Sequence, residues 1–312
     1  MLYLIDEAKK PEPKLHELLV KYFALNRMDI VQREGNYPPP PGASEILGVE
    51  VSGIVAEVGS DVTRYKPGDE VFGLMGGGGY AEYAILHEDL ALPLGNLSFE
   101  VAASIPEVWC TAYQAIHYIG QIKPGDDVLI HAGASGVGSV AIKLAKKAGA
   151  NRIFTTSSCA EKLDFCRGLG ATHLINYKQE KFVDVVRQAT NGRGVDVIVD
   201  FIAAGYFEDN ISSLAIDGRM SMQALLGGAK TEVNLAPIVF KRLKIEGSAL
   251  RSRSIEYQRD LLQLLRREII PGIESGKLTH CVDKVFSWKD IAEAHRYMEQ
   301  NKNMGKIVVR VD

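Results

Sequence analysis

The stretch DVLIHAGASGVGSVAIKLAKKA, residues 127–148, joins an apolar run to a glycine-rich turn and then to a helical pattern. Residues 127–131 have the apolar composition of a buried strand, and residues 137–148 carry apolar side chains at helical spacing. A strand that leads through such a turn directly into a helix is typical of an α/β domain with a parallel sheet.

Three glycines, Gly133, Gly136 and Gly138, lie in this turn. Residues without side chains let backbone N–H groups approach an anion, and the helix that follows adds unpaired donors and positive potential. Ser135 replaces the middle glycine of the common GxGxxG pattern, so the strand–turn–helix context carries the interpretation. We interpret the turn, together with Val137, as the binding site for the pyrophosphate of a dinucleotide. The alternative is a structural turn without a ligand.

The sequence after this turn predicts five more strands, separated mostly by helical patterns. The strands are expected at residues 152–156, 173–176, 195–202, 219–225 and 243–250. This alternation predicts a Rossmann domain over residues 109–250, in which helices cover both faces of a doubly wound parallel sheet.

The rest of the chain, residues 1–108 and 251–312, predicts a β-rich domain into which the Rossmann domain is inserted. Residues 1–108 have an all-β pattern, with four glycines at 76–79 where the backbone bends or approaches another segment closely. The elements expected after residue 250 are a helix at 254–275, a strand at 282–286, a helix at 288–300 and a strand at 306–311.

Composition limits the classes of partner. The chain has 312 residues, a formal charge of -3 and a pI near 6.2. It therefore lacks the excess of basic residues that nucleic acid or a membrane surface would favour, and a small soluble substrate fits better. No apolar run reaches the ~20 residues of a membrane span, and the charged N-terminus does not suit a signal peptide. We expect a cytoplasmic protein, and four scattered cysteines without a CxxC motif agree with reduced thiols.

The end of the second predicted strand bears on the choice of cofactor. Residues 154–158 read FTTSS, where an NAD-specific fold carries Asp or Glu against the ribose 2′-hydroxyl. Hydroxyls of this segment, Ser157 among them, together with Lys162 and Tyr177, instead suit a 2′-phosphate. The neighbouring Glu161 argues against this, and the alternative for Lys162 is a solvated surface charge. We favour NADPH over NADH.

Segments across almost the whole chain resemble one known family. They are residues 24–29 (ALNRMD), 35–44 (GNYPPPPGAS), 46–50 (ILGVE), 105–107 (IPE), 129–138 (LIHAGASGVG) and 301–308 (NKNMGKIV). Together they resemble the zeta-crystallin-like quinone oxidoreductases of the medium-chain dehydrogenase/reductase superfamily. The resemblance implies a GroES-like β-rich domain, a cofactor cleft between the domains, and reduction of quinones or related conjugated carbonyl compounds with NADPH.

The resemblance also implies the site residues. Asn26, Tyr37 and Ser135 are the expected catalytic residues, and Asn26 and Tyr37 would border the nicotinamide and the substrate. Cofactor contacts besides the turn are expected from Asn26, Tyr37, Thr111, Ser157, Lys162, Tyr177, Ile202, Ala224, Leu225, Leu226, Ser248, Ala249, Leu250 and Asn303. Residues 200–205 depart from the family, because they carry alanines where relatives often have glycines.

The positions of the zinc ligands in the superfamily hold other residues here. Asn26 takes the first position, the Gly-His-Glu motif reads GVE at residues 48–50, and Glu107 takes the third position, three residues before Cys110. This set does not make a zinc site, so we expect no metal. Without a Lewis acid, alcohol oxidation is disfavoured. A quinone or enone needs less help, because its own π-system spreads the charge of an added hydride.

Tyr37 is the expected hydrogen-bond donor to the substrate carbonyl. The alternative is an aromatic residue that packs on the four prolines at residues 38–41. Two other functions remain open with the same fold and cofactor. One is reduction of an enoyl thioester, and the other is NADPH binding without catalysis, as in crystallin-like lens proteins.

The sequence predicts two strands that have no neighbouring strand on one side. By the resemblance, the chain begins at the second strand of the β-rich domain, so an opening hairpin is expected to be missing and to leave an unpaired edge beside residues 2–5. In the Rossmann domain, the strand at 243–250 is expected at the sheet edge, where Ile245, Gly247, Ala249 and Leu250 offer little charge to discourage pairing. We expect a homodimer through this strand, the alternative being a monomer in which a loop or residues 251–253 cover the edge.

Overall fold

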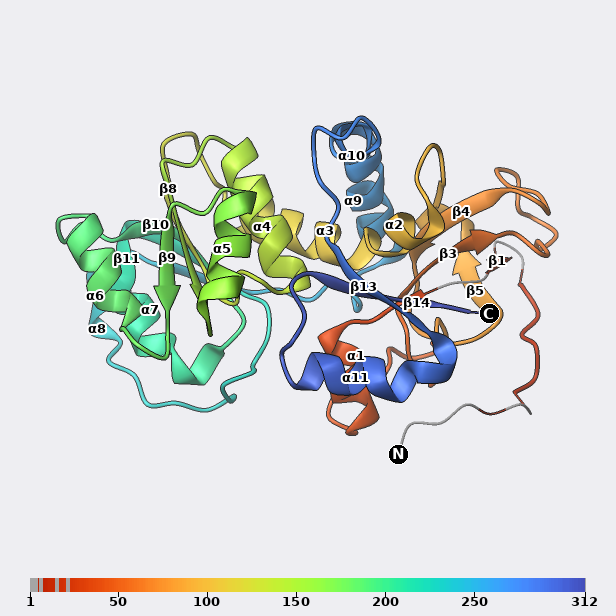
Figure 1. Cartoon of the computed structure of the whole chain (residues 1–312), viewed down its shortest axis with the longest axis horizontal. Coiled ribbons are helices and arrows are strands. Elements are labelled where there is room, and N and C mark those ends of the chain that lie inside the picture. The colour runs from red at the N-terminus through yellow and green to blue at the C-terminus, as the bar shows by residue number, and fades with distance from the viewer. Residues whose placement is uncertain (1–4, 6–7, 15–16, 21–22, 312) are drawn as a thin grey trace. The chain divides into compact units, whose positions relative to one another are not determined.

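The computed structural model describes residues 5, 8–14, 17–20 and 23–311. The chain divides into two compact units, Met1–Cys110 with Leu250–Asp312, and Thr111–Ala249. Each unit has its own sheet or sheets and is described by itself (Figure 1).

The unit Thr111–Ala249 has the doubly wound α/β fold that the sequence predicts. Its 6-stranded sheet is parallel throughout and has the order β12-β11-β10-β7-β8-β9. The strands are β7 (Asp127–Ile130), β8 (Arg152–Ser157), β9 (His173–Asn176), β10 (Val195–Asp200), β11 (Leu214–Met222) and β12 (Lys244–Gly247). The chain runs outward from β7 to β9 and then outward on the other side from β10 to β12. Ligands of such sheets bind where the order reverses, at the carboxyl ends of the strands.

Helices cover both faces of this sheet. They are α4 (Gly136–Lys147), α5 (Ala160–Leu169), α6 (Phe182–Ala189), α7 (Phe207–Ser213), α8 (Ala236–Phe240), the π-helical η2 (Gln114–Ile119) and the short η3 (Ala203–Gly205). In Figure 1, α4 and α5 lie on one side of the sheet, and α6 and α7 lie on the other. On the second side, Phe182 and Val186 of α6 pack on the buried Phe154, Ile198 and Met220 of the sheet.

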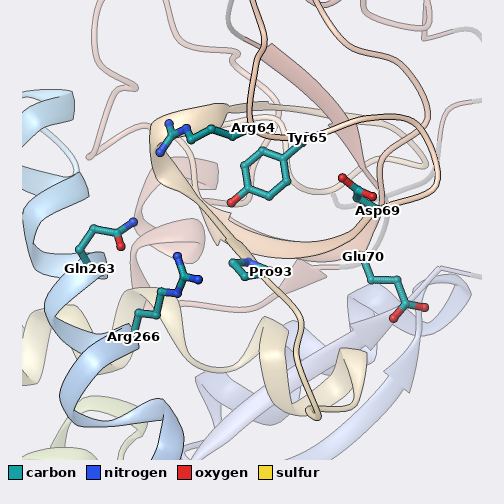
Figure 2. Close-up of a pocket in the computed structure, with 7 residues that line it drawn as sticks. All are labelled: Arg64, Tyr65, Asp69, Glu70, Pro93, Gln263 and Arg266. Atoms are coloured by element: carbon teal, nitrogen blue, oxygen red, sulfur yellow. The ribbon is translucent and has the colours of Figure 1, made fainter.

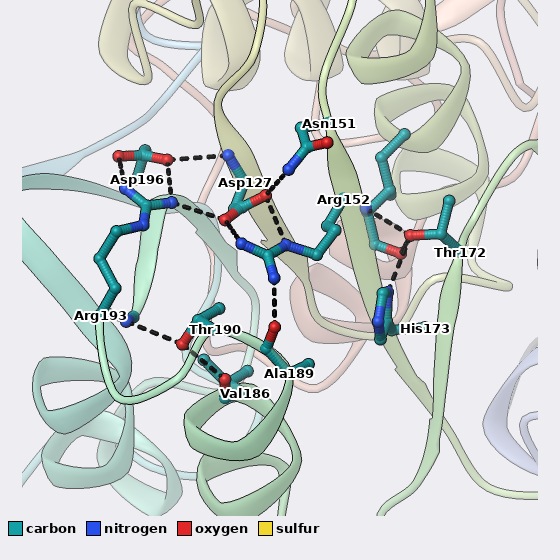
Figure 3. Close-up of polar contacts among 12 residues, drawn as sticks. Asp127, Asn151, Arg152, Thr172, His173, Val186, Ala189, Thr190, Arg193 and Asp196 are labelled. Atoms are coloured by element: carbon teal, nitrogen blue, oxygen red, sulfur yellow. Dashed lines mark hydrogen bonds and ion pairs between the residues drawn. The ribbon is translucent and has the colours of Figure 1, made fainter.

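An ion network joins the amino ends of these strands (Figure 3). The buried Asp127 carboxylate accepts hydrogen bonds from Arg152 (Nη2, 2.6 Å), Arg193 (Nη2, 2.5 Å) and Asn151 (Nδ2, 3.0 Å). Burial raises the pKa of Asp127, but these hydrogen bonds outweigh it and hold the pKa below its ordinary value. Because the network lies at the start of β7, it is at the opposite end of the strand from the glycine-rich turn.

Several strand boundaries differ from the prediction, and β11 differs most. The strand expected at 219–225 is β11, which starts at Leu214 and ends at Met222. Leu214 pairs with Val195 before the register shifts, and Asp217 within the shifted segment has a φ of 61°. The sequence pattern does not show this irregularity, because the pairing partner decides it.

The other unit is built on a sheet that joins both ends of the chain. Its order is β13-β14-β2-β3-β4-β6, with β13 parallel to β14 and the other pairs antiparallel. Its strands are β2 (Phe23–Ala24), β3 (Glu50–Ile54), β4 (Glu70–Leu74), β6 (Ala91–Pro93), β13 (Val282–Ser287) and β14 (Lys306–Arg310). A second, 2-stranded sheet pairs β1 (Glu17–Val20) with β5 (Ala84–His87).

The expectation that residues 1–108 are all-β was wrong. The helices of this unit are α1 (Arg27–Arg33), η1 (Glu88–Leu90), α2 (Phe99–Ala103), α3 (Pro106–Tyr113, which continues into the other unit), α9 (Ile255–Glu268), α10 (Ile270–Glu274), η4 (Trp288–Asp290) and α11 (Ile291–Glu299). Local start signals explain the early helices: the Ser98 hydroxyl accepts from Val101 N (3.4 Å) at α2, and Pro106 is the first residue of α3.

The single helix expected at 254–275 is two helices, α9 and α10. Pro271 lacks an N–H donor and therefore fits the first turn of a new helix better than the middle of a long one. Ile269, between the two helices, has a φ of -115°. The helix expected at 288–300 is likewise divided into η4 and α11.

The four glycines at 76–79 approach another segment closely, as predicted. Gly78 N donates to Ile46 O (2.7 Å), and a Cβ atom on Gly77 would lie 2.5 Å from Ser44 O. Residues with side chains would therefore push the two segments apart.

The unpaired strand edge expected beside residues 2–5 lies outside the residues that the structure describes, except for Ile5. No helix in the described part of the chain has the length and apolar character that crossing a membrane requires.

Candidate active site

The glycine-rich turn between β7 and α4 is held by its own backbone and by the sheet. Ser135 caps α4, because its hydroxyl oxygen accepts from Gly138 N (3.0 Å). A Cβ atom on Gly133 would lie 1.9 Å from Thr155 Oγ1, and one on Gly138 would lie 2.3 Å from Ala132 O. Packing alone therefore excludes side chains at both positions.

His131 lies at the end of β7 and is fully buried. Its Nε2 atom lies 2.7 Å from Asn210 Oδ1, and because an amide oxygen only accepts, Nε2 carries the proton. The Thr156 hydroxyl accepts from Ala132 N (3.2 Å) and donates to His131 Nδ1 (3.1 Å). Burial lowers the pKa of His131, in agreement with a neutral ring. Both ring nitrogens hold the turn, and neither is available for proton transfer.

The residues predicted to meet a 2′-phosphate lie at the carboxyl ends of β8 and β9. Ser157 ends β8, pairs with Asn176 of β9, and accepts a hydrogen bond from Tyr177 N (3.2 Å). The Tyr177 side chain is exposed, and Lys162 lies in the first turn of α5. Since β8 and β9 are parallel to β7, these residues are at the same edge of the sheet as the glycine-rich turn.

The loops after β10, β11 and β12 are hydrogen-bonded to one another at this edge. Leu226 N donates to Phe201 O (3.1 Å), and Ser248 N donates to Met222 O (2.8 Å). The Ser248 hydroxyl accepts from Gln114 Nε2 (2.7 Å). The structure thus brings together most of the predicted cofactor contacts of this unit: Ile202, Ala224, Leu225, Leu226, Ser248 and Ala249. Thr111 lies in α3 and is half-buried.

The alanines of residues 200–205 adopt the turn that glycine would adopt. Ala203 has a φ of 61°, in the left-handed region. The Asp200 carboxylate stabilises this turn, because it accepts from Ile202 N (2.8 Å) and Ala203 N (3.0 Å). The departure from the family pattern is therefore compensated locally by an acidic residue.

In the other unit, the predicted catalytic residue Asn26 belongs to a buried cluster. Its Nδ2 donates to Glu50 Oε1 (2.8 Å), and its Oδ1 accepts from Lys306 Nζ (2.5 Å). Lys306 and Glu50 form an ion pair of 2.5 Å, and their side chains are 2% and 0% exposed. The second oxygen of Glu50 accepts from Glu107 N (2.9 Å), at the start of α3. The Asn26 side chain is thus fixed by two charged neighbours.

A second chain of hydrogen bonds starts at the Asp29 carboxylate. It accepts from Asn26 N (2.7 Å), Gly48 N (3.2 Å) and the Tyr80 hydroxyl (3.1 Å). His295 Nε2 lies 3.2 Å from the same hydroxyl, and burial lowers the pKa of His295 to about 4, so the ring is neutral and donates to Tyr80. Burial raises the pKa of Asp29 to about 6. These contacts fix the start of α1 against the loop that precedes β3.

Tyr37 is half-buried and lies beside Arg251, whose Cζ atom is 5.6 Å from the centre of the Tyr37 ring. Burial and Glu107 raise the pKa of Tyr37, and Arg251 partly opposes them. The phenol therefore stays protonated at neutral pH and acts as a donor. Of the remaining predicted contacts in this unit, Leu250 is buried, and Asn303 Nδ2 donates to Gly305 O (2.9 Å).

The residues at the zinc-ligand positions do not fit a catalytic zinc. The Asn26 amide and the Glu50 carboxylate are bonded to each other and to Lys306. Burial, with Glu107 and Glu50 nearby, raises the pKa of the Cys110 thiol well above its ordinary value. Within the part of the chain that the structure describes, no three His, Cys, Asp or Glu side chains are grouped to hold a metal ion.

A cavity of about 410 Å³ lies elsewhere in the same unit (Figure 2). It is lined by Arg64, Tyr65, Asp69, Glu70, Pro93, Gln263 and Arg266, and no predicted site residue is among them. The Tyr65 hydroxyl donates to Ala91 O (2.8 Å), and Arg64 is paired with Glu88 (3.4 Å) and Asp89. Because no predicted site residue lines this cavity, we assign no ligand to it.

The sequence did not predict Lys306 or Arg251 as site residues. Both types of side chain are usually solvated, but here Lys306 is 2% exposed and Arg251 is 6% exposed. One signal was present: Lys306 opens a predicted apolar strand, where a charge needs a buried partner.

Comparison with known sequences finds two matching family models and relatives of several kinds. A family model described as zinc-binding dehydrogenase matches residues 136–267, and the alcohol dehydrogenase GroES-like domain matches residues 14–96. A zinc-type alcohol dehydrogenase-like protein of Schizosaccharomyces pombe is 32% identical, over 95% of this chain and 91% of that protein. The quinone oxidoreductase of Rattus norvegicus is 27% identical, over 99% and 93%. Highly-reducing polyketide synthase 1 of Aureobasidium melanogenum is 30% identical over 98% of this chain, which spans only 14% of that protein.

Solved structures with the same fold carry several activities. An NAD-dependent alcohol dehydrogenase has a TM-score of 0.84 and 33% identity, over 98% of this chain and 95% of that chain. The Escherichia coli quinone oxidoreductase complexed with NADPH has a TM-score of 0.87 and 30% identity, over 98% and 94%. The CurK enoyl reductase has a TM-score of 0.84 and 28% identity, over 98% and 94%.

We expect Lys306→Met to lower the free energy of unfolding by about 3–5 kcal/mol, because it leaves the Glu50 carboxylate buried without its counter-charge. Lys306→Arg keeps the charge and should cost less. Urea unfolding followed by circular dichroism measures both, with the exposed Lys302→Met as the control. A Lys306→Met variant as stable as the control would contradict the role assigned to the pair.

Proposed function

The chain belongs to the medium-chain dehydrogenase/reductase superfamily, and we propose that it is a zinc-independent, NADPH-dependent reductase of quinones or related conjugated carbonyl compounds. The observation that carries the proposal is the buried Asn26–Glu50–Lys306 cluster. The Asn26 and Glu50 side chains at the zinc-ligand positions are hydrogen-bonded within this cluster. They therefore do not provide the ligands of a metal ion that would polarise a simple ketone. Conjugated acceptors do not depend on such polarisation.

The proposed chemistry divides between the cofactor and the protein. Bound NADPH supplies the hydride. Asn26 is held by two charged partners and offers a fixed amide beside the nicotinamide, and the Tyr37 hydroxyl donates a hydrogen bond to the carbonyl oxygen of the substrate. We propose Ser135 as a cofactor-side residue whose hydroxyl, which already caps α4, can donate to a phosphate oxygen.

The choice of NADPH rests on the carboxyl ends of β8 and β9. Residues 154–158 contain no acid that would repel a 2′-phosphate, and Ser157 lies next to the backbone of the exposed Tyr177. Lys162, in the first turn of α5, adds a positive charge at this edge. The Escherichia coli quinone oxidoreductase, which has this fold, was solved in complex with NADPH.

Two other functions are alternatives to the proposed quinone reduction. Similarity to the CurK enoyl reductase and to a polyketide synthase favours an enoyl-thioester substrate as the alternative. NADPH binding without turnover, as in crystallin-like proteins, is the second alternative. Within the quinone reductases, we propose the subgroup of the p53-inducible quinone oxidoreductase, which the sequence resembles. We also propose a cytoplasmic location, in agreement with four cysteines that form no disulfide.

We expect the purified protein to oxidise NADPH with a quinone or an enone and to do so equally in the presence of a metal chelator. The steady-state rate, followed by the absorbance of NADPH, is compared with the rate on a crotonyl thioester. A higher kcat/KM on the thioester would assign the chain to the enoyl-reductase class instead. NADPH binding without oxidation by any acceptor would support the non-catalytic alternative.

We expect NADPH to bind more tightly than NADH, and Lys162→Ala to weaken NADPH by roughly tenfold, because a charge-assisted hydrogen bond to the 2′-phosphate is lost. NADH affinity should not change. Fluorescence titration at constant salt measures both, with Lys146→Ala, near the carboxyl end of α4, as the matched control. Equal affinity of the wild type for the two cofactors would rule out this assignment.

We further propose a homodimer through the outer edge of β12, the terminal strand of its sheet. Val239 and Phe240, just before β12, are 70% and 78% exposed. Because Ser248 N donates inward to Met222 O, alternation along the strand directs the N–H of Ile245 toward the free edge. Two copies related by a twofold axis could join their sheets there.

Light scattering at micromolar concentration should therefore give about twice the chain mass of 34.2 kDa. Ile245→Pro should shift the protein toward the single-chain mass, because it removes an outward donor and spares the inward ladder. Ile245→Val keeps the N–H and should stay dimeric. A wild type that remains at the single-chain mass would refute the dimer.

A further inference from the structure

Arg251 is a buried cation whose guanidinium is only partly bonded. The residue is 6% exposed. Its Nε donates to Gly76 O (2.8 Å), and its Nη1 donates to Gln32 Oε1 (2.8 Å). Its Nη2 is buried and has no hydrogen-bond partner in the described part of the chain. A donor of this kind is rare in folded proteins, and it calls for a partner that binds from outside.

Arg251 also has no directly bonded counter-charge among the described residues. Both of its protein partners are neutral oxygens, and no carboxylate among the described residues forms an ion pair with it. Burial lowers the pKa of Arg251 from its ordinary value, although Tyr37, Asp29 and Glu107 oppose this. Lys306, by contrast, has the Glu50 carboxylate as its counter-charge. A buried cation whose hydrogen-bond partners are all neutral favours an anionic ligand oxygen.

The position of Arg251 relates it to Tyr37. The guanidinium carbon is 5.6 Å from the centre of the Tyr37 ring. Tyr37 is half-buried, so its side chain remains partly accessible. Nη2 lies near the glycine segment 76–79, because a Cβ atom on Gly77 would be 3.3 Å from it. The absence of side chains there leaves Nη2 beside bare backbone.

We propose that Arg251 and Tyr37 together form the oxyanion-binding pair of the substrate site, in which Nη2 and the Tyr37 hydroxyl bind the oxygen that becomes negative during reduction. The inference rests on the proposed reductase function. When hydride adds to a conjugated acceptor, its electron pair displaces the π-electrons toward the carbonyl oxygen, and NADPH becomes NADP⁺. The oxyanion then takes one proton from solvent. Arg251 stabilises the charge before that proton arrives.

The first test compares Arg251→Met with Arg253→Met. Arg253 is a matched control, because it lies two residues away and its guanidinium also covers a tyrosine, Tyr257 (4.8 Å), but at an exposed position. We expect Arg251→Met to lower kcat/KM roughly 100- to 1,000-fold for a weakly activated quinone. Arg251→Lys should keep part of the activity, and Arg253→Met should keep nearly all of it. The Kd for NADPH should be the same in all variants, which excludes misfolding.

A series of quinones with different substituents separates charge stabilisation from a structural role. The loss in Arg251→Met should be largest for acceptors whose product oxygen is most basic and smallest for electron-poor acceptors, which carry the charge themselves. The same trend is expected for Tyr37→Phe, with Tyr257→Phe as its control. An equal loss for every acceptor, or no loss, would overturn the proposal.

A binding measurement tests the pair without turnover. The probe is 4-nitrophenol, titrated into the full chain with NADP⁺ by calorimetry at pH values below and above the pKa of the phenol. The wild type should bind the phenolate more tightly than the neutral phenol, and Arg251→Met should lose this preference. Equal phenolate affinity in the two proteins would overturn the pair. If the wild type reduces no acceptor but binds the phenolate through Arg251, the proposed function fails and the anion site stands.

Discussion

The ion pair between Lys306 and Glu50 is the constraint on which the β-rich unit depends. It joins β14, the last strand of the chain, to β3, although the two residues are 256 positions apart in the sequence. Their side chains are 2% and 0% exposed. Two charges removed from water are expensive, and the cost is recovered only when every remaining polar atom is bonded. Asn26 and the N–H of Glu107 complete that set, so the pair fixes the starts of α1 and α3 as well as the two strands.

The same unit contains a second buried cation, Arg251, which has no carboxylate partner in the described part of the chain. Arg251 has two neutral acceptors and one unbonded nitrogen, whereas Lys306 has a carboxylate. Burial alone therefore does not distinguish structure from function. The distinction lies in whether the protein itself supplies the counter-charge, because a group left incomplete in the folded chain retains the capacity to bind an external one.

In the α/β unit, the two ends of the parallel strands differ: the amino ends stabilise the fold, and the carboxyl ends are expected to bind the cofactor. The amino ends carry the Asp127 ion network, in which each charge has a partner. The carboxyl ends carry the glycine-rich turn, the Ser157 and Tyr177 positions and the mutually bonded loops after β10 and β11. Parallel strands place every one of these loops at one edge, so a single sheet geometry brings five separate segments of expected cofactor contacts together.

The sequence by itself determined the α/β unit closely. β7, the turn and α4 are specified by neighbouring residues, and the periodicity of short apolar runs predicted the other strands, because such runs must be buried on both faces of a parallel sheet. Through family resemblance it also predicted Asn26 and Tyr37 as site residues. It did not determine the early helices, the break at Pro271 or the start of β11, where capping and pairing partners outweigh the local pattern. Only the tertiary structure decided what Asn26, Lys306 and Arg251 contact: Lys306 and Asn26 are 280 positions apart, and Arg251 and Gly76 are 175 apart. No local pattern encodes such pairings, since the free energy that buries a charge comes from the partner that folding brings to it.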